Sequence, residues 1–255
     1  MKRGINHYIE LLMVMTEKEL RARYKYTVFG FLWLIINPLL QMLVIGFIFS
    51  FFMKSPMEYY YFYLFTGLLI WNFFSLSLTK ATPSIVFERS LIKKAMFPRM
   101  VIPIAIIASN LLHLFIAMIL LMIPLIFVHP ISFMNIIFLG IGFILLLMFT
   151  IGLSLLTSAL NVRFRDVTFF VQALLIVWFY ATPIVYSFMV VPKEYHWLWI
   201  FNPMTSIVQF FQYALMHYPL PTLSICVGNI FIIISITIMG SIIFQKESKN
   251  FDDWI

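Results

Sequence analysis

The chain has 255 residues, of which 63% are hydrophobic and 11% are charged. Soluble domains carry about 25% charged residues, so this composition excludes an ordinary soluble domain and predicts a membrane protein. The formal net charge of +7 does not indicate nucleic-acid binding, because no soluble domain remains to present the basic residues; beside apolar stretches they favour contact with anionic lipid headgroups.

Residues 1–27 are predicted to form a cytoplasmic amphipathic helix that lies on the membrane surface. Apolar residues recur near helical spacing at Ile5, Ile9, Leu12, Leu20 and Tyr24. Glu17, Arg21 and Lys25 fall four residues apart on another face, with the acid first, which is the favourable order in a helix. A helix that is apolar on one side and charged on the other is typical of the membrane interface. A solvated cytoplasmic helix is the alternative.

Six apolar stretches follow, each close to the length of about 20 residues that a helix needs to cross the hydrocarbon. We place them at Val28–Met53, Tyr59–Thr79, Val101–Val128, Phe133–Leu160, Val167–Met189 and Thr222–Phe244. Together they predict one all-α domain, residues 28–244, with six transmembrane helices. Asn37-Pro38 and Thr182-Pro183 each place a proline inside a span. Because the carbonyl freed by a proline needs a protein or water partner, Asn37 is expected to face protein or a pore.

Basic residues gather in alternate gaps between these stretches. One side holds Lys2, Arg3, Lys18, Arg21, Arg23, Lys25, Lys80, Arg89, Lys93, Lys94, Arg99, Arg163, Arg165, Lys246 and Lys249. The other side holds only Lys54 and Lys193. Since cytoplasmic loops keep the Lys and Arg residues, we predict a multi-pass protein of the cell membrane with both termini in the cytoplasm, including the tail at residues 245–255.

The cytoplasmic gap at residues 80–100 contains a candidate docking segment for a partner protein. Glu88–Phe97 can form a short amphipathic helix, which Pro98 would end because the residue before a proline disfavours helical geometry. Leu91, Ile92 and Phe97 suit a hydrophobic socket on the partner, and the lysines suit its acidic rims. The predicted contact residues are Glu88, Arg89, Ser90, Leu91, Ile92, Lys93, Lys94, Phe97 and Pro98. A positively charged loop that only orients the chain is the alternative.

The gap at residues 190–221 lies on the predicted outer side and is too aromatic for a free loop. It contains three tryptophan or tyrosine residues between Tyr195 and Trp199, and Asn202-Pro203 divides it in two. Trp and Tyr favour headgroup depth. We therefore expect short interfacial or re-entrant helices here.

The spans lack the groups that catalysis or ion coupling would need. None contains an Asp, Glu, Lys or Arg well inside it, and such groups are rare at membrane depth unless they are used. His113 stands alone in the third span, where a hydrogen bond to a neighbouring helix is the expected role. No phosphate loop for ATP and no histidine pair with zinc spacing occurs. We therefore expect no enzyme activity, cofactor or metal in this chain, and an energy source on a separate motor protein.

Five motifs in chain order resemble the membrane subunits of ATP-binding-cassette (ABC) exporters of lipid-linked polysaccharides. These motifs are Glu19–Tyr24 with Gly30–Leu40, Leu91–Lys94 with Phe97–Arg99, Leu160–Val167, Thr182–Tyr186 and Asn202-Pro203. The likeness extends from about residue 5 to residue 245, and no fused ATPase or carbohydrate-binding domain is expected.

The resemblance implies a homodimer with two copies of an ATPase subunit, which would bind the ATP and Mg²⁺. A glycan path between two bundles agrees with this, because six helices from one chain pack around a filled core. The family's path is lined by the first and fifth spans, which implies roles for Trp33, Asn37, Tyr180, Thr182 and Tyr186. The expected cargo is O-antigen, wall teichoic acid or a related surface glycan.

Three other functions remain open from the sequence. The same architecture could export a drug, lipid or haem. An intramembrane acyl or glycosyl transferase would need acidic or histidine residues gathered at one membrane face, and the outer side offers only Glu58, Glu194 and a few histidines. A passive channel would have no use for the docking segment.

Overall fold

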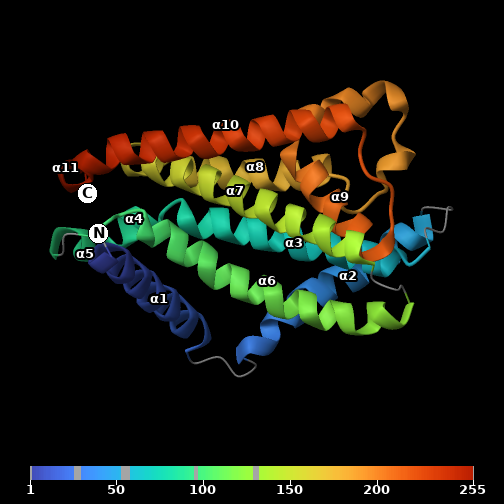
Figure 1. Cartoon of the computed structure of the whole chain (residues 1–255), viewed down its shortest axis with the longest axis horizontal. Helices are drawn as coiled ribbons and strands as arrows, with labels where there is room; N and C mark the ends of the chain where they lie inside the picture. The colour runs from blue at the N-terminus through green and yellow to red at the C-terminus, as the bar shows by residue number, and fades with distance from the viewer. Residues whose placement is uncertain (1, 26–29, 53–57, 95–96, 129–131, 255) are drawn as a thin grey trace.

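The computed structural model describes residues 2–25, 30–52, 58–94, 97–128 and 132–254, and within these ranges it contains helices and no strand. Four helices are long and apolar enough to cross a membrane: α3 (Tyr60–Ala81), α6 (Val101–Val128), α7 (Phe133–Arg163) and α10 (Leu223–Glu247). Two shorter apolar helices, α2 (Trp33–Phe52) and α8 (Val167–Ala181), accompany them. The long helices run along one axis of the molecule (Figure 1). The fold is that of an all-α membrane protein, and the count of six spans stays a prediction.

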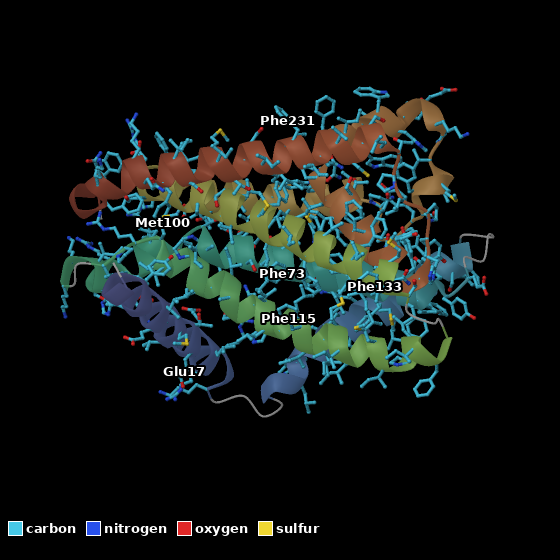
Figure 2. All side chains as sticks on the ribbon, viewed as in Figure 1. Glu17, Phe73, Met100, Phe115, Phe133 and Phe231 are labelled. Atoms are coloured by element: carbon cyan, nitrogen blue, oxygen red, sulfur yellow. The ribbon has the colours of Figure 1, made fainter. Side chains whose placement is uncertain are left out.

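Helix α3 lies at the centre of the bundle. In its most apolar stretch 72% of the residues are buried within the chain, compared with 22% in α10. It packs against α2, α6, α7, α8 and the short α9 (Pro203–Met216). The peripheral helices instead expose large apolar side chains such as Phe47 and Phe231, and Phe231 lies on the outer side of α10 (Figure 2). Such apolar outer faces suit a bilayer.

Both chain ends lie at the same end of the bundle, together with α4 (Ser84–Phe87) and α5 (Arg89–Lys94); α1 (Lys2–Tyr24) begins at this end and runs obliquely toward the middle of the bundle (Figure 1). Helix α1 packs along α6. A separate apolar cluster, which includes Met15, Ile92 and Phe251, fills this end. We call this end of the bundle the basic end, because α5 with Arg89, Lys93 and Lys94 lies here, together with the end of α7 at Arg163 and the end of α10 beside Lys246. The opposite end, which carries α9, matches the predicted outer side.

The fifth predicted span, Val167–Met189, is not one helix. Helix α8 ends at Ala181, and Thr182 takes an extended conformation, because the residue before a proline disfavours helical geometry. The chain continues irregularly to a 3₁₀ turn at Phe188–Val190. Two tyrosines of α3 bond to backbone carbonyls of this irregular segment. The Tyr60 hydroxyl donates to Val185 O at 2.8 Å, and the Tyr63 hydroxyl lies 3.0 Å from Pro183 O. Irregular backbone at membrane depth is tolerated when protein buries it in this way.

Helix α6 has the predicted limits Val101 and Val128, and α7 begins at the predicted Phe133, whereas the remaining span limits differ from the predicted ones by a few residues. Helix α2 begins at Trp33 after a 3₁₀ turn at Gly30–Leu32 and continues through Pro38. The predicted limits Val28 and Met53 lie outside the described residues. Helices α3, α7 and α10 continue two or three residues beyond the predicted Thr79, Leu160 and Phe244.

The predicted outer segment is divided at Asn202, as expected. A 3₁₀ helix, Lys193–Phe201, exposes Trp197 and Phe201, and α9 follows from Pro203. Thirteen residues of α9 are buried, so it packs inside the bundle against α7 and α3. This position agrees with the predicted re-entrant helix, and the exposed rings of the 3₁₀ helix agree with the predicted interfacial one.

The tail is folded, whereas the sequence shows only a short charged end. After α10 come a 3₁₀ turn, Ser248–Asn250, and a short helix α11, Phe251–Trp254. The Phe251 side chain is fully buried and meets the Phe244 ring edge-on at 5.5 Å. The last residues therefore belong to the apolar cluster of the basic end.

Candidate functional site

The spans present a polar surface on the side of α3 between α2 and α8. Asn72, Ser75 and Thr79 follow at spacings of three and four residues, which places them on one face of α3. The Asn72 side-chain amide donates to Gln41 Oε1 of α2 at 3.0 Å. We call Gln41, Asn72, Ser75 and Thr79 the polar stripe. Polar side chains at membrane depth normally face protein or water rather than lipid, so the stripe marks a candidate site.

Two grooves share the polar stripe as a common wall. The first, of about 350 Å³, lies among α2, α3 and α6, and its lining includes Trp33, Asn37 and His113. The second, of about 520 Å³, lies among α2, α3 and α8, and its lining includes Gln172 and Tyr180. All four residues of the polar stripe line both grooves. The two grooves therefore form one surface that faces outward between the helices.

This surface suits a neutral ligand with many hydroxyl groups. Amide and hydroxyl side chains can bond to hydroxyls, and the rings of Trp33 and Tyr180 can pack against apolar C–H faces. No Asp, Glu, Lys or Arg appears among the described residues that line the two grooves. In the same described ranges, no three His, Cys, Asp or Glu side chains are placed to hold a metal ion. The described lining residues can therefore bind such a ligand through hydrogen bonds and ring packing.

The structure brings three of the five predicted path residues to the grooves. Trp33 and Asn37 line the first groove, and Tyr180 lines the second. Tyr186 instead packs against a separate apolar cluster that includes Trp199. Its hydroxyl donates to Tyr180 O at 3.1 Å.

Thr182, the fifth predicted path residue, is fully buried. Its hydroxyl donates to Trp178 O at 2.9 Å and accepts from Asn202 Nδ2 at 3.1 Å. Asn202 Oδ1 in turn accepts from the Trp178 indole at 2.8 Å. The two residues that precede prolines, Thr182 and Asn202, thus meet in one buried junction that fixes the end of α8 against the start of α9. This position gives Thr182 no access to either groove.

Sequence reasoning missed the polar stripe and Gln172. The signal was present, because each is an uncharged polar residue in an otherwise apolar stretch. Three of them recur at helical spacing on α3. Only the arrangement of α2 and α8 around α3 distinguishes these residues from buried polar ones such as Ser77, which accepts a hydrogen bond from Asn110 at 3.0 Å inside the bundle.

The cytoplasmic gap predicted at residues 80–100 contains two short helices at the basic end: α4, which precedes the predicted docking segment, and α5, which lies within it. Helix α5 covers Arg89–Lys94 of the predicted Glu88–Phe97; residues 95 and 96 lie outside the described ranges, and Phe97 and Pro98 are not helical. The outward face carries Arg89, Ser90, Lys93 and Lys94, all exposed. Glu88 is paired with Lys18 of α1 at 2.6 Å, so the segment is tied to the N-terminal helix.

The apolar residues of this segment differ from the prediction. Ile92 is buried within the chain, and Leu91 and Phe97 pack on the apolar cluster of the basic end. They therefore hold α5 to the bundle, and Ile92 is not available to a hydrophobic socket on a partner. Phe87, which sequence reasoning did not select, is instead 78% exposed beside the cations.

A polar network fixes α1 to the bundle. The Arg23 guanidinium contacts His113 Nδ1 and donates to Asn110 Oδ1, both at 2.5 Å. Asn110 donates in turn to Ser77 of α3. His113 thus bonds to a neighbouring helix, which is the expected role for a lone histidine in a span. Because His113 and Asn110 line the first groove, the network also sets the position of α1 relative to that groove.

Replacing Arg23 with glutamine is expected to loosen α1. The change leaves Asn110 Oδ1 and His113 Nδ1 without their charged partner, and hydrogen bonds to charged groups contribute about 1.5–3 kcal/mol. Thermal unfolding of the purified protein should shift to lower temperature, and protease should cleave α1 faster. Arg21→Gln is the control, since Arg21 is exposed and pairs only with exposed Glu17 in a surface ion pair of little energetic value. Equal stability of the two variants would contradict the role given to Arg23.

Comparison with known proteins places this architecture in a family. The model for the ABC-2 type transporter matches residues 10–216. The chain is 34% identical to an O-antigen export system permease protein RfbA of Klebsiella pneumoniae, over 98% of this chain and 97% of the relative. A second K. pneumoniae protein of that name is 32% identical, over 98% of this chain and 97% of the relative. One from Myxococcus xanthus is 29% identical, over 99% and 98% respectively. These matches confirm the resemblance predicted from the motifs: the chain belongs to the ABC-2 type transporter family.

Proposed function

We propose that this chain is the membrane subunit of an ABC exporter that moves a lipid-linked polysaccharide, O-antigen or a similar surface glycan, across the cytoplasmic membrane. Both termini are in the cytoplasm, six helices cross the bilayer, and a separate ATPase subunit binds ATP and Mg²⁺ and supplies the energy. The family and three relatives named for O-antigen export, aligned over nearly their full lengths, support this proposal.

The observation that carries the proposal is the polar stripe between α2 and α8. A polysaccharide presents hydroxyls and apolar ring faces in alternation, and the stripe with Trp33 and Tyr180 supplies partners for both. Export of a smaller drug or lipid would favour an enclosed apolar pocket instead. The uncharged lining also suits a long chain that must slide, because no fixed charge holds one unit in place.

The grooves are open on one side, so we propose that a second copy of the chain closes them. Its α2 and α8 would face those of the first copy, and the two polar stripes would then line a shared path. Helix α5 of each copy docks one ATPase subunit through Arg89, Lys93 and Lys94, with exposed Phe87 beside them. Closure of the ATPase dimer pushes these helices, and the two bundles shift at their interface.

The polar stripe is tested by Asn72→Leu. Loss of this amide removes its bond to Gln41 and a partner for glycan hydroxyls, so we expect export of the surface glycan to fall about tenfold, equivalent to ~1.4 kcal/mol, with the bound ATPase unchanged. Glycan at the cell surface and co-purified ATPase are measured together. Ser235→Leu, a polar-to-leucine change on the exposed side of α10, is the control. Equal export by the two variants would remove the stripe from the path.

A further inference from the structure

We propose that the C-terminal segment, Ser248–Trp254, is a clamp that joins the two cytoplasmic connections of the bundle into one moving unit. The first connection, described at residues 97–100, leads into α6; the second, residues 164–166, links α7 to α8. The role of the clamp in transport rests on the proposed function, whereas the mechanical link itself does not.

Arg99 anchors the clamp to the first connection. Its guanidinium donates to Ser248 O and lies 5.9 Å from the centroid of the Phe251 ring. Phe251 is fully buried and meets Phe244 of α10. A guanidinium over an aromatic face is stabilised by the ring quadrupole, and more so where water is excluded. Arg99 therefore connects the residue pair that follows α5, Phe97-Pro98, to the end of α10.

Arg163 anchors the clamp to the second connection. It is the last residue of α7, and its guanidinium lies 5.6 Å from the centroid of the Trp254 ring and 5.3 Å from that of Phe164. The cation thus contacts both an aromatic ring of the connection and one of the clamp. Two arginines, one in the first connection and one directly before the second, contact aromatic rings three residues apart in the same short segment.

The clamp gives a force on α5 a direct route to the long helices. Helix α5 is only six residues long, and α4 is the helix that it chiefly contacts. Through Arg99 its motion reaches the clamp, and from there α10 and, through Arg163, α7. Because α7 and α10 pack closely along their lengths, a displaced clamp moves both. A contiguous set of packed and bonded groups of this kind carries energetic coupling between distant sites.

Hydrogen–deuterium exchange of the purified chain alone tests the mechanical link. Arg99→Gln removes the cation from the first connection, and we expect faster exchange not only at residues 97–100 but also at 163–167, with α3 unchanged. Lys249→Ala is the matched control, because Lys249 is exposed within the same segment. Unchanged exchange at 163–167 would overturn the clamp, and so would an equal rise throughout α3, since that would indicate general destabilisation.

Reconstitution with the ATPase subunit tests the role in transport. We expect truncation after Glu247, and the milder Phe251→Leu, to leave co-purified ATPase and ATP hydrolysis intact while glycan exported per ATP falls about tenfold, within the range of coupling between two sites. A parallel fall of all three quantities would make the segment a docking or folding element and overturn the proposal. A wild-type chain that bound no ATPase would overturn the proposed function, while the exchange experiment would still decide the clamp.

Discussion

Reversing the charges of Lys93 and Lys94 to glutamate is expected to abolish stable binding of the ATPase subunit. Both lysines are exposed on α5, and the double variant changes the local charge by four units where an acidic partner surface is proposed. Like charges placed opposite one another cost several kcal/mol, so the affinity should fall by at least about tenfold, equivalent to ~1.4 kcal/mol. Co-purification of the ATPase with the tagged chain measures the effect.

The same variant should insert and fold normally, because buried Ile92 rather than the lysines holds α5 to the bundle. Lys246→Glu with Lys249→Glu provides a control of equal charge at the same end of the molecule, away from α5. Equal recovery of the ATPase with the docking variant and with this control would show that the charges of α5 only orient the chain and do not bind the ATPase.

Replacing Gly240 with valine is expected to prevent stable packing of α10 on α7. A Cβ added at Gly240 would lie 2.1 Å from Gly152 O, and one added at Gly152 would lie 2.5 Å from Thr237 Cα. Both obstacles are backbone atoms, which cannot turn aside as a side chain can. The helices would have to separate, which would also break the bond from the Thr237 hydroxyl to Met148 O at 2.9 Å. Small residues allow this close approach in membranes.

Overpacking costs about 1–3 kcal/mol at ordinary sites, and a contact with backbone lies at or beyond the upper end of that range. We expect Gly240→Val to lose most of its folded protein, as measured by the monodisperse yield in detergent and the unfolding temperature. Gly140→Ala on α7 is the control, because among the described residues nothing beyond the local helix backbone lies within 4 Å of its added Cβ, and alanine favours helix over glycine by up to about 1 kcal/mol. A Gly240→Val protein as stable as the control would contradict the close contact between the backbones of α7 and α10.

The long helices could be predicted well because few physical rules decide them. Hydrocarbon thickness sets the length of a span, and charges or prolines set its ends; α6 begins and ends at the predicted Val101 and Val128. The prediction of one continuous helix for the fifth span was wrong, for a reason that only the three-dimensional structure shows. Its apolar residues continue beyond Ala181, but Tyr60 and Tyr63 of α3 satisfy the backbone carbonyls there, so the chain can leave the helix while still buried.

The candidate site was less predictable, because access depends on neighbouring helices. Trp33, Asn37 and Tyr180 line the grooves, and their role in a substrate path stays a prediction. Thr182 lies at the same helix end as Tyr180, yet it is fully buried. Its hydroxyl accepts a hydrogen bond from Asn202, which lies 20 residues further along the chain. The tail was underestimated for the same reason: burial of Phe251 requires the partners Phe244 and Arg99, which local sequence does not place beside it.

We propose that the energy for transport comes from a separate ATPase subunit and not from an ion gradient through this chain. The decisive measurement compares vesicles that contain the purified chain alone with vesicles that contain the chain and its ATPase subunit, each loaded with labelled lipid-linked glycan. We expect labelled glycan to cross only in the presence of both proteins and ATP, whatever ion gradient is applied. Uphill movement driven by a proton or sodium gradient through the chain alone would contradict the account.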